Sequence, residues 1–244
     1  MRTLLIPLLL PFALLSLVAS PARAAYAPYD PSMPAHAEYI IDALHLHPTQ
    51  FCLGFREVTF KAGLLDRMSP AQATAFMKKK NVPVVIGPGG VPYLADGHHT
   101  VRALLESTQP DKRVYGHILA NWSRLPLGEF WQRMVEHHYA YLKDSEGRGP
   151  VDPAKLPANL LGMQSDPYRS LAWGVLAHHG YREVKGPSGF FQEFHWGDYF
   201  RDKVRWNDND TASFERAVVE AVALAHDPAA RALPGYIPGS DSAE

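Results

Sequence analysis

The sequence contains only one cysteine, Cys52, among its 244 residues. A single cysteine cannot form an intramolecular disulfide, so the disulfide-stapled folds of small secreted proteins are excluded. The sequence also lacks an excess of charge of one sign, because 24 Lys and Arg residues stand against 25 Asp and Glu residues. A chain without a basic surface is not expected to require duplex DNA as an obligatory partner.

Long apolar runs are absent except near the N-terminus, where residues 4–18 are almost wholly apolar. Arg2 precedes this run, and the small-residue sequence Ala22-Arg23-Ala24 follows it. This order is typical of a secretory signal peptide, which we assign to residues 1–24 with cleavage after Ala24. The run is short for a membrane-spanning helix, and two prolines interrupt it. We therefore expect a periplasmic or secreted protein with no stable membrane span.

The stretch that organises the rest of the chain is residues 82–106. Residues 82–86 are a β-branched run, and Gly87-Pro88-Gly89-Gly90 supplies the chemistry of a turn. Residues 91–95 form a return run, after which apolar residues recur at helical spacing. The pattern predicts a hairpin whose second strand leads through Asp96-Gly97-His98-His99 into a helix.

This strand-to-helix junction carries groups that suit an anion. The N–H groups that open a helix lack intrahelical partners and lie at the positive end of its dipole, so a phosphate can bind there. Imidazoles that titrate near neutral pH can serve as general acids, general bases or metal ligands. Asp-Gly is also an ordinary tight turn, with Gly97 at positive φ and Asp96 as the helix cap. The adjacent His98 and His99 are harder to explain by packing alone.

These residues resemble the core of the ParB and sulfiredoxin superfamily, and the DGHH sequence is similar to the signature of its ParB-like nuclease branch. The resemblance covers roughly residues 38–205. Further similar segments are Pro48-Thr49-Gln50, Gly54, Glu57-Val58 and Lys61 upstream, and Phe130-Trp131, Met134, residues 166–171, Glu193-Phe194 and Trp196 downstream. Their joint occurrence is more specific than DGHH alone. The resemblance implies the fold of that superfamily and a nuclease or related phosphoesterase activity.

One position departs from the superfamily pattern, since Thr100 stands where related members commonly place an arginine. The guanidinium that would hold a phosphate is therefore missing unless Arg102 replaces it. Arg169 could also supply this contact in three dimensions, although an exposed arginine is the simpler interpretation. Sulfiredoxin-type repair is excluded, because His98 occupies the position of its nucleophilic cysteine. We expect Cys52 to be a buried small side chain rather than a nucleophile.

Glu57 and Lys61 lie four residues apart, so on a helix they would form an ion pair on one face. Alternatively, Glu57 could act as a general base beside the DGHH loop. The catalytic candidates are thus Asp96, His98, His99 and Glu57, and the ligand-binding candidates are Gln50, Lys61, Gly97, Thr100, Arg102 and Arg169.

We predict an α+β fold in which a small mixed sheet of the ParB/sulfiredoxin type carries a C-terminal helical extension. The predicted parts are the signal peptide at 1–24, an irregular lead-in at 25–37, an α/β core at 38–122, a helical extension packed on the core at 123–228 and a loose tail at 229–244. Strands are expected at 39–46 and 114–120, and the alternation of His45 and His47 would place both side chains on one face of the first strand. Helices are expected at 69–79, opened by a capping box at Ser69, at 127–142, and from Asp166, as the N-cap, to about Gly180.

Three functions are compatible with these residues. The first is hydrolysis or transfer at a phosphate ester, with the phosphate on the backbone of residues 97–99. The second is binding of a small phosphorylated or anionic ligand without turnover. The third is a divalent-metal site, with ligands drawn from Asp96, His98, His99, His45, His47 and His117. The near-zero net charge does not favour a long polyanion as substrate.

Overall fold

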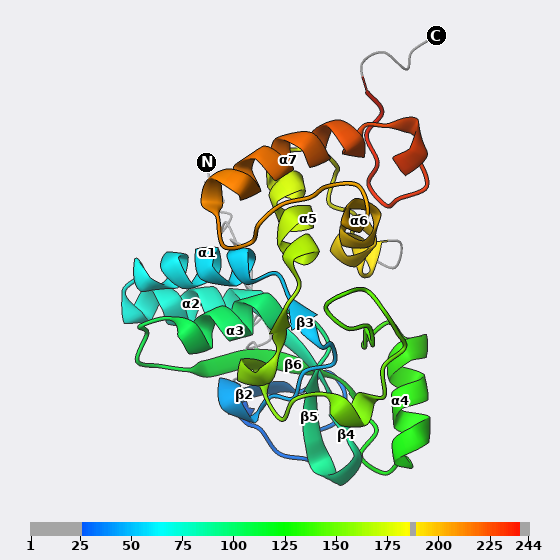
Figure 1. Cartoon of the computed structure of the whole chain (residues 1–244). Helices are drawn as coiled ribbons and strands as arrows, with labels where there is room; N and C mark the ends of the chain where they lie inside the picture. The colour runs from blue at the N-terminus through cyan, green and yellow to red at the C-terminus, as the bar shows by residue number, and fades with distance from the viewer. Residues whose placement is uncertain (1–25, 186–188, 240–244) are drawn as a thin grey trace, which may run out of the picture.

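The computed structural model describes residues 26–185 and 189–239 (Figure 1). The predicted signal peptide, residues 1–24, lies outside the described residues. None of the helices in the described part of the chain is long and apolar enough to cross a membrane. The chain forms a mixed sheet with helices on both faces, and three further helices stand beyond one end of this layer (Figure 1). The predicted α+β fold with a small mixed sheet is confirmed.

The sheet has five strands in the order β1-β2-β6-β4-β5. Their bounds are β1 Ala27–Pro28, β2 Glu38–Asp42, β4 Val82–Gly87, β5 Val91–Leu94 and β6 Arg113–Asn121. The predicted hairpin is confirmed, because β4 and β5 pair antiparallel across the Gly-rich turn. β4 runs parallel to β6, and β6 runs antiparallel to β2. The lead-in is less irregular than predicted, since β1 pairs with β2.

The strand predicted at residues 39–46 is shorter than expected. It ends at Asp42, whose carboxylate accepts a hydrogen bond from Leu44 N at 2.9 Å and caps the 3-10 helix η1, Ala43–His45. The prediction that His45 and His47 share one face of a strand is therefore wrong. Their alternation applied to extended backbone, and the side-chain cap replaces that backbone with a turn.

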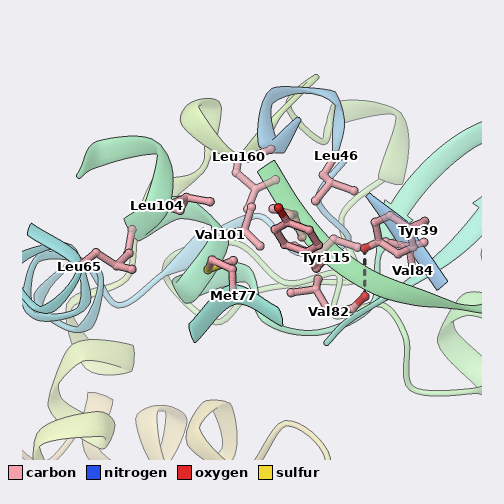
Figure 2. Close-up of a cluster of buried hydrophobic side chains, with 14 of the residues drawn as sticks. Tyr39, Leu46, Leu65, Met77, Val82, Val84, Val101, Leu104, Tyr115 and Leu160 are labelled. Carbon is pink, nitrogen blue, oxygen red and sulfur yellow. Dashed lines mark hydrogen bonds between the residues drawn. The ribbon is translucent and has the colours of Figure 1, made fainter. Parts of the chain in front are cut away.

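Three helices cover one face of the sheet, namely α1 (Phe55–Asp66), α2 (Pro70–Lys80) and α3 (His98–Glu106). The capping box predicted at Ser69 opens α2: its side chain accepts from Gln72 N, and the Gln72 side chain accepts from Ser69 N. Figure 2 shows the core beneath these helices, where fully buried side chains of α1, α2 and α3 meet those of the strands. Within it, the Tyr39 hydroxyl donates to the Val82 carbonyl at 2.9 Å.

The opposite face of the sheet is covered by α4 (Leu127–Glu136). Val85 alternates with the core residues Val84 and Ile86 along β4, so it points to this face and packs with Phe130 and Met134. The helix predicted over residues 127–142 ends early, because His138 takes a left-handed conformation with φ of 57°. The first part of the predicted extension thus packs on the sheet.

The remaining helices, α5 (Pro167–Ala177), α6 (Gln192–Arg201) and α7 (Thr211–Ala225), pack around a second hydrophobic cluster that includes Leu171, Trp196 and Val218. As predicted, Asp166 caps α5 and accepts from Tyr168 N at 2.9 Å. The two short strands β3 (Cys52–Leu53) and β7 (Gln164–Ser165) pair in parallel and bring the start of α5 against the start of α1.

The predicted loose tail at residues 229–244 is packed along its described part, which ends at residue 239. Ala230 is fully buried in the cluster of α5–α7. The carbonyl of Pro234 accepts hydrogen bonds from Trp196 Nε1 at 2.9 Å and from Gln192 Nε2 at 2.8 Å. Proline content predicted a lack of regular structure, but these side-chain donors fix an irregular segment in place.

Candidate functional site

His98 and His99 open α3 and point back into the protein, towards the loop that precedes α1. Nε2 of His98 accepts a hydrogen bond from the backbone N–H of Thr49 at 3.2 Å, and Nε2 of His99 accepts one from Gly54 N at 3.0 Å. Both imidazoles are buried, with residue exposures of 5% and 7%. The DGHH sequence therefore ties the start of α3 to residues 49–54, which the resemblance had grouped in its first segment.

The two imidazoles are neutral at physiological pH. Burial lowers the pKa of His98 to about 3, with neighbouring His99 and Arg169 acting in the same direction. Burial also lowers the pKa of His99 to about 3, although the negative charge of Glu57 opposes the change. Because Nε2 is the acceptor in each ring, the ring proton is assigned to Nδ1. In this arrangement the histidines position the loop through hydrogen bonds and carry no net charge.

Glu57 extends from the first turn of α1 into the same region. Its Oε1 pairs with Lys61 Nζ at 2.5 Å, and its Oε2 lies 3.3 Å from His99 Nε2. Burial raises the pKa of the Glu57 carboxyl, but the positively charged Lys61 and Arg169 act against burial, and the pKa is lowered. Within the described residues Oε2 has no hydrogen-bond donor. The predicted ion pair is confirmed, and among the described residues it leaves one buried carboxylate oxygen without a hydrogen-bond donor.

Arg169 lies in the first turn of α5 and is buried, so the interpretation as an exposed arginine is wrong. Its guanidinium carbon lies 4.3 Å from the centroid of the Phe194 ring, and Nη1 forms an ion pair with Glu193 Oε2. Across the described part of the chain, Arg169 Nε has no hydrogen-bond acceptor. Gly54, three residues before Glu57, lies against the Arg169 backbone, and the positive charge of Arg169 helps to lower the pKa of the Glu57 carboxyl, so Arg169 belongs to the same cluster. An arginine with a free donor in this position can bind an anionic group.

Gly54 makes this convergence of α1 and α5 possible. A Cβ atom added to Gly54 would lie 2.8 Å from Ser170 N and 3.0 Å from the Arg169 carbonyl carbon. Only glycine therefore allows the chain before α1 to approach the first turn of α5 closely enough for both helices to share one site. The same residue donates the hydrogen bond to His99.

Other candidate residues lie around the cluster with different environments. Gln50 and Thr100 are buried, and the backbone of Gln50 bridges to Tyr141. Gly97 adopts the predicted positive φ, 88°, and is the N-cap of α3. Asp96 does not cap the helix as predicted, since its Oδ1 accepts from the adjacent Gly97 N at 2.6 Å. Its side chain is exposed, whereas the histidines are buried.

Arg102 is held by contacts outside the cluster. Nε pairs with Glu106 at 2.6 Å, and Nη1 donates to the Leu160 carbonyl at 2.6 Å. The guanidinium also lies over the Phe55 ring, 5.1 Å from its centroid. These contacts brace α3 against the segment around Leu160, and they make Arg169 the better candidate for the missing arginine.

The proposed metal ligands are not assembled in the structure. The described residues contain no group of three or more His, Cys, Asp or Glu side chains that could hold a metal ion. Asp96 is exposed while His98 and His99 are buried with Nε2 on backbone donors. The residues present therefore do not fit a bound cation at the DGHH sequence.

Sequence reasoning assigned no role to Thr49, Glu193 or Phe194, which prove to contact the candidate residues directly. Thr49 donates its N–H to His98, and its hydroxyl donates to the Leu94 carbonyl at 2.7 Å. Glu193 and Phe194 hold the Arg169 guanidinium. All three fall in segments that resemble the family, and that was the one signal in the sequence that could have marked them.

The fold and sequence are similar to those of known proteins. The solved structure of protein Atu1540 from Agrobacterium tumefaciens is 34% identical, with a TM-score of 0.72, and the match covers 83% of this chain and 97% of that chain. No functionally curated protein matches the sequence. The family model described as "Putative ParB-like nuclease" matches residues 39–202. That range includes α1, α3, α5 and the whole cluster described above, and the chain belongs to the ParB-like nuclease family.

Proposed function

We propose that this chain is an exported phosphoesterase that binds a small phosphorylated ligand at the cluster of Glu57, Lys61, His98, His99 and Arg169. The observation that carries the proposal is the convergence of these side chains from α1, α3 and α5. Glu57 Oε1 lies 2.5 Å from Lys61 Nζ and Glu57 Oε2 lies 3.3 Å from His99 Nε2, and Arg169 helps to lower the pKa of the Glu57 carboxyl. Buried charges with unsatisfied polar atoms are costly, and such groups concentrate at functional sites.

Each residue has a chemical role in this proposal. Arg169 Nε and Lys61 Nζ bind the anionic oxygens of the phosphate, because both are cationic donors at the same cluster. Glu57 is ionised, so its free Oε2 can accept a proton from the water that attacks phosphorus. As the new P–O bond forms, the P–O bond to the ester oxygen breaks, and the departing alkoxide takes a proton from water and leaves as the alcohol. His98 and His99 hold residues 49–54 as neutral acceptors and position Glu57. Asp96, which is exposed, has no role in this chemistry.

A second candidate function is binding of the same ligand without turnover. It is favoured by the state of the imidazoles, since neither His98 nor His99 is a cation that could act as a general acid. Each Nε2 atom already accepts a hydrogen bond from a backbone N–H, so it is not free to act as a general base. In that case Glu57 would orient Lys61 and Arg169 and take no proton.

The test measures turnover and binding together. Phosphate or alcohol release would be followed for simple phosphomonoesters, phosphodiesters, nucleotides and short DNA, with binding of the same compounds by calorimetry. Glu57→Gln is expected to lower kcat by about 10²-fold or more, as expected for loss of a general base, and to leave a folded protein. Glu129→Gln is the matched control, because Glu129 forms the same i,i+4 pair on an exposed helix face with Arg133.

The outcomes separate the two functions. Turnover that depends on Glu57 supports the phosphoesterase, and binding without turnover supports the second candidate. Neither binding nor turnover by the wild-type chain with any compound would refute both. Recovery of the mature chain, lacking residues 1–24, from the periplasm or medium tests the proposed export, and retention of the full chain in the cytoplasm would contradict it.

A further inference from the structure

The ion pair between Arg169 and Glu193 joins α5 to α6 at the edge of the site. The Arg169 side chain is 10% exposed, whereas the Glu193 side chain is 21% exposed. Glu57 and Asp166 are also acidic residues whose charges act on Arg169, but their side chains are only 7% and 4% exposed. Of these three carboxylates, Glu193 is therefore the one that can turn towards solvent without a large rearrangement.

The formal charges of the cluster cancel once Glu193 is included. Arg169 and Lys61 are cationic, Glu57 and Glu193 are anionic, and the histidines are neutral. The charge of the neighbouring Asp166 is matched by its own ion pair with Arg201. Burying a net charge is unfavourable, and partly buried ion pairs are stable only while each charge has a partner. An anion that bound Arg169 while Glu193 stayed in place would leave the cluster with an excess negative charge. Neutrality is kept when Glu193 leaves and a group with one negative charge replaces it.

We propose that Glu193 is the internal anion of this site and that a singly charged group of the ligand displaces it from Arg169. This inference rests on the proposed function, because it requires Arg169 to bind the ligand. It also specifies the ligand class, since a phosphate carrying one charge preserves neutrality and a terminal phosphate carrying two charges does not. Glu193 is thus a specificity-determining residue that contacts Arg169 and not the reacting atoms.

Two features of the structure favour the displacement of Glu193 by a ligand. The ring of Phe194 lies against the Arg169 guanidinium, at 4.3 Å from its carbon, so the guanidinium stays in position when the carboxylate leaves. Glu193 itself lies in the first turn of α6, where the helix dipole stabilises a negative charge after the ion pair is broken.

The experiment compares two probes of different charge with the purified chain at about pH 8, where a phosphomonoester is doubly charged. Dimethyl phosphate carries one charge and methyl phosphate carries two. The wild-type chain is expected to bind dimethyl phosphate more tightly. Glu193→Gln removes the competing carboxylate and is expected to tighten dimethyl phosphate binding by about 5- to 150-fold, the usual size of coupling between two binding events. Glu193→Ala is a second variant with the same expectation.

Asp198→Asn is the matched control, because it removes a negative charge from the same helix at a residue paired with Lys143. Its affinity for dimethyl phosphate is expected to stay within about twofold of wild type. Unchanged or weaker binding by folded Glu193→Gln and Glu193→Ala would overturn the exchange. Tighter wild-type binding of methyl phosphate would overturn the charge class, and this comparison needs no substitution.

The result also separates this inference from the function beneath it. If neither probe nor any phosphoester binds the wild-type chain, the proposed function fails and the inference fails with it. If dimethyl phosphate binds and Arg169→Gln abolishes that binding while the Glu193 variants bind no tighter, the proposed function stands and only the exchange is refuted.

Discussion

Acidification should destabilise this fold through its two buried histidines. Each has a pKa lowered to about 3 in the folded chain, mainly by burial, against about 6.5 when unfolded. Between these values the unfolded chain binds protons that the folded chain does not, so stability falls as the pH falls from about 6.5. Each histidine contributes a slope of about 1.4 kcal/mol per pH unit, or roughly 2 kcal/mol between pH 6.5 and 5. The pair together contributes roughly 4 kcal/mol.

The free energy of unfolding would be measured by urea denaturation over this pH range. In His98→Gln/His99→Gln the slope is expected to fall by about 3 kcal/mol per pH unit, because glutamine keeps an acceptor for the loop but does not titrate. The control is His137→Gln/His138→Gln, which makes the same two substitutions at an adjacent pair of histidines whose side chains are exposed. A pair variant with the wild-type slope would refute the assignment of His98 and His99 as neutral buried acceptors.

Glu57 does not confound this window. Its pKa is lowered in the folded chain, so the stability it contributes is present above its unfolded value of 4.5 and is lost as the pH falls below it. The two effects therefore occupy different ranges. The histidine slope appears first on acidification, and the Glu57 slope follows only below about pH 4.5.

Three further predictions concern the junctions that hold the site. Gly54→Ala should lower the free energy of unfolding in urea by about 1–3 kcal/mol, because its Cβ would meet the α5 backbone. Gly128→Ala is the control and should not lower it, because a Cβ there has nothing within 4 Å. Equal effects of the two substitutions would contradict the close approach at Gly54. Burial raises the pKa of the Cys52 thiol to about 12, so thiol reagents at neutral pH should label it only on unfolding, and rapid labelling of the folded chain would argue against burial. Truncation after Asp227 should lower the melting temperature, because it removes the Pro234 carbonyl that accepts hydrogen bonds from two α6 side chains. A melting temperature unchanged within about 2 °C would show that the tail does not stabilise α5–α7.

Much of the fold followed from local patterns in the sequence. The β-branched run before a Gly-rich turn predicted the β4–β5 hairpin, and the Ser69 and Asp166 caps predicted the starts of α2 and α5. These features depend on residues close together in the chain, where backbone sterics and side-chain caps act. The predictions that failed, such as the strand at 39–46 and the long helix at 127–142, failed at element ends. There a single side-chain hydrogen bond or left-handed residue competes with the repeat pattern.

The candidate site divides in the same way. The sequence by itself placed His98 and His99 after Gly97 and set Glu57 four residues before Lys61, so the members of each local pair were known. Only the tertiary structure decided that the imidazoles face inward as neutral acceptors, that Arg169 is buried beside Glu57, and that Glu193 neutralises it. Charge state and burial are set by atoms that other elements bring to a group. These depend on how α1, α3 and α5 pack, because desolvation and Coulomb interactions act through space and not along the chain.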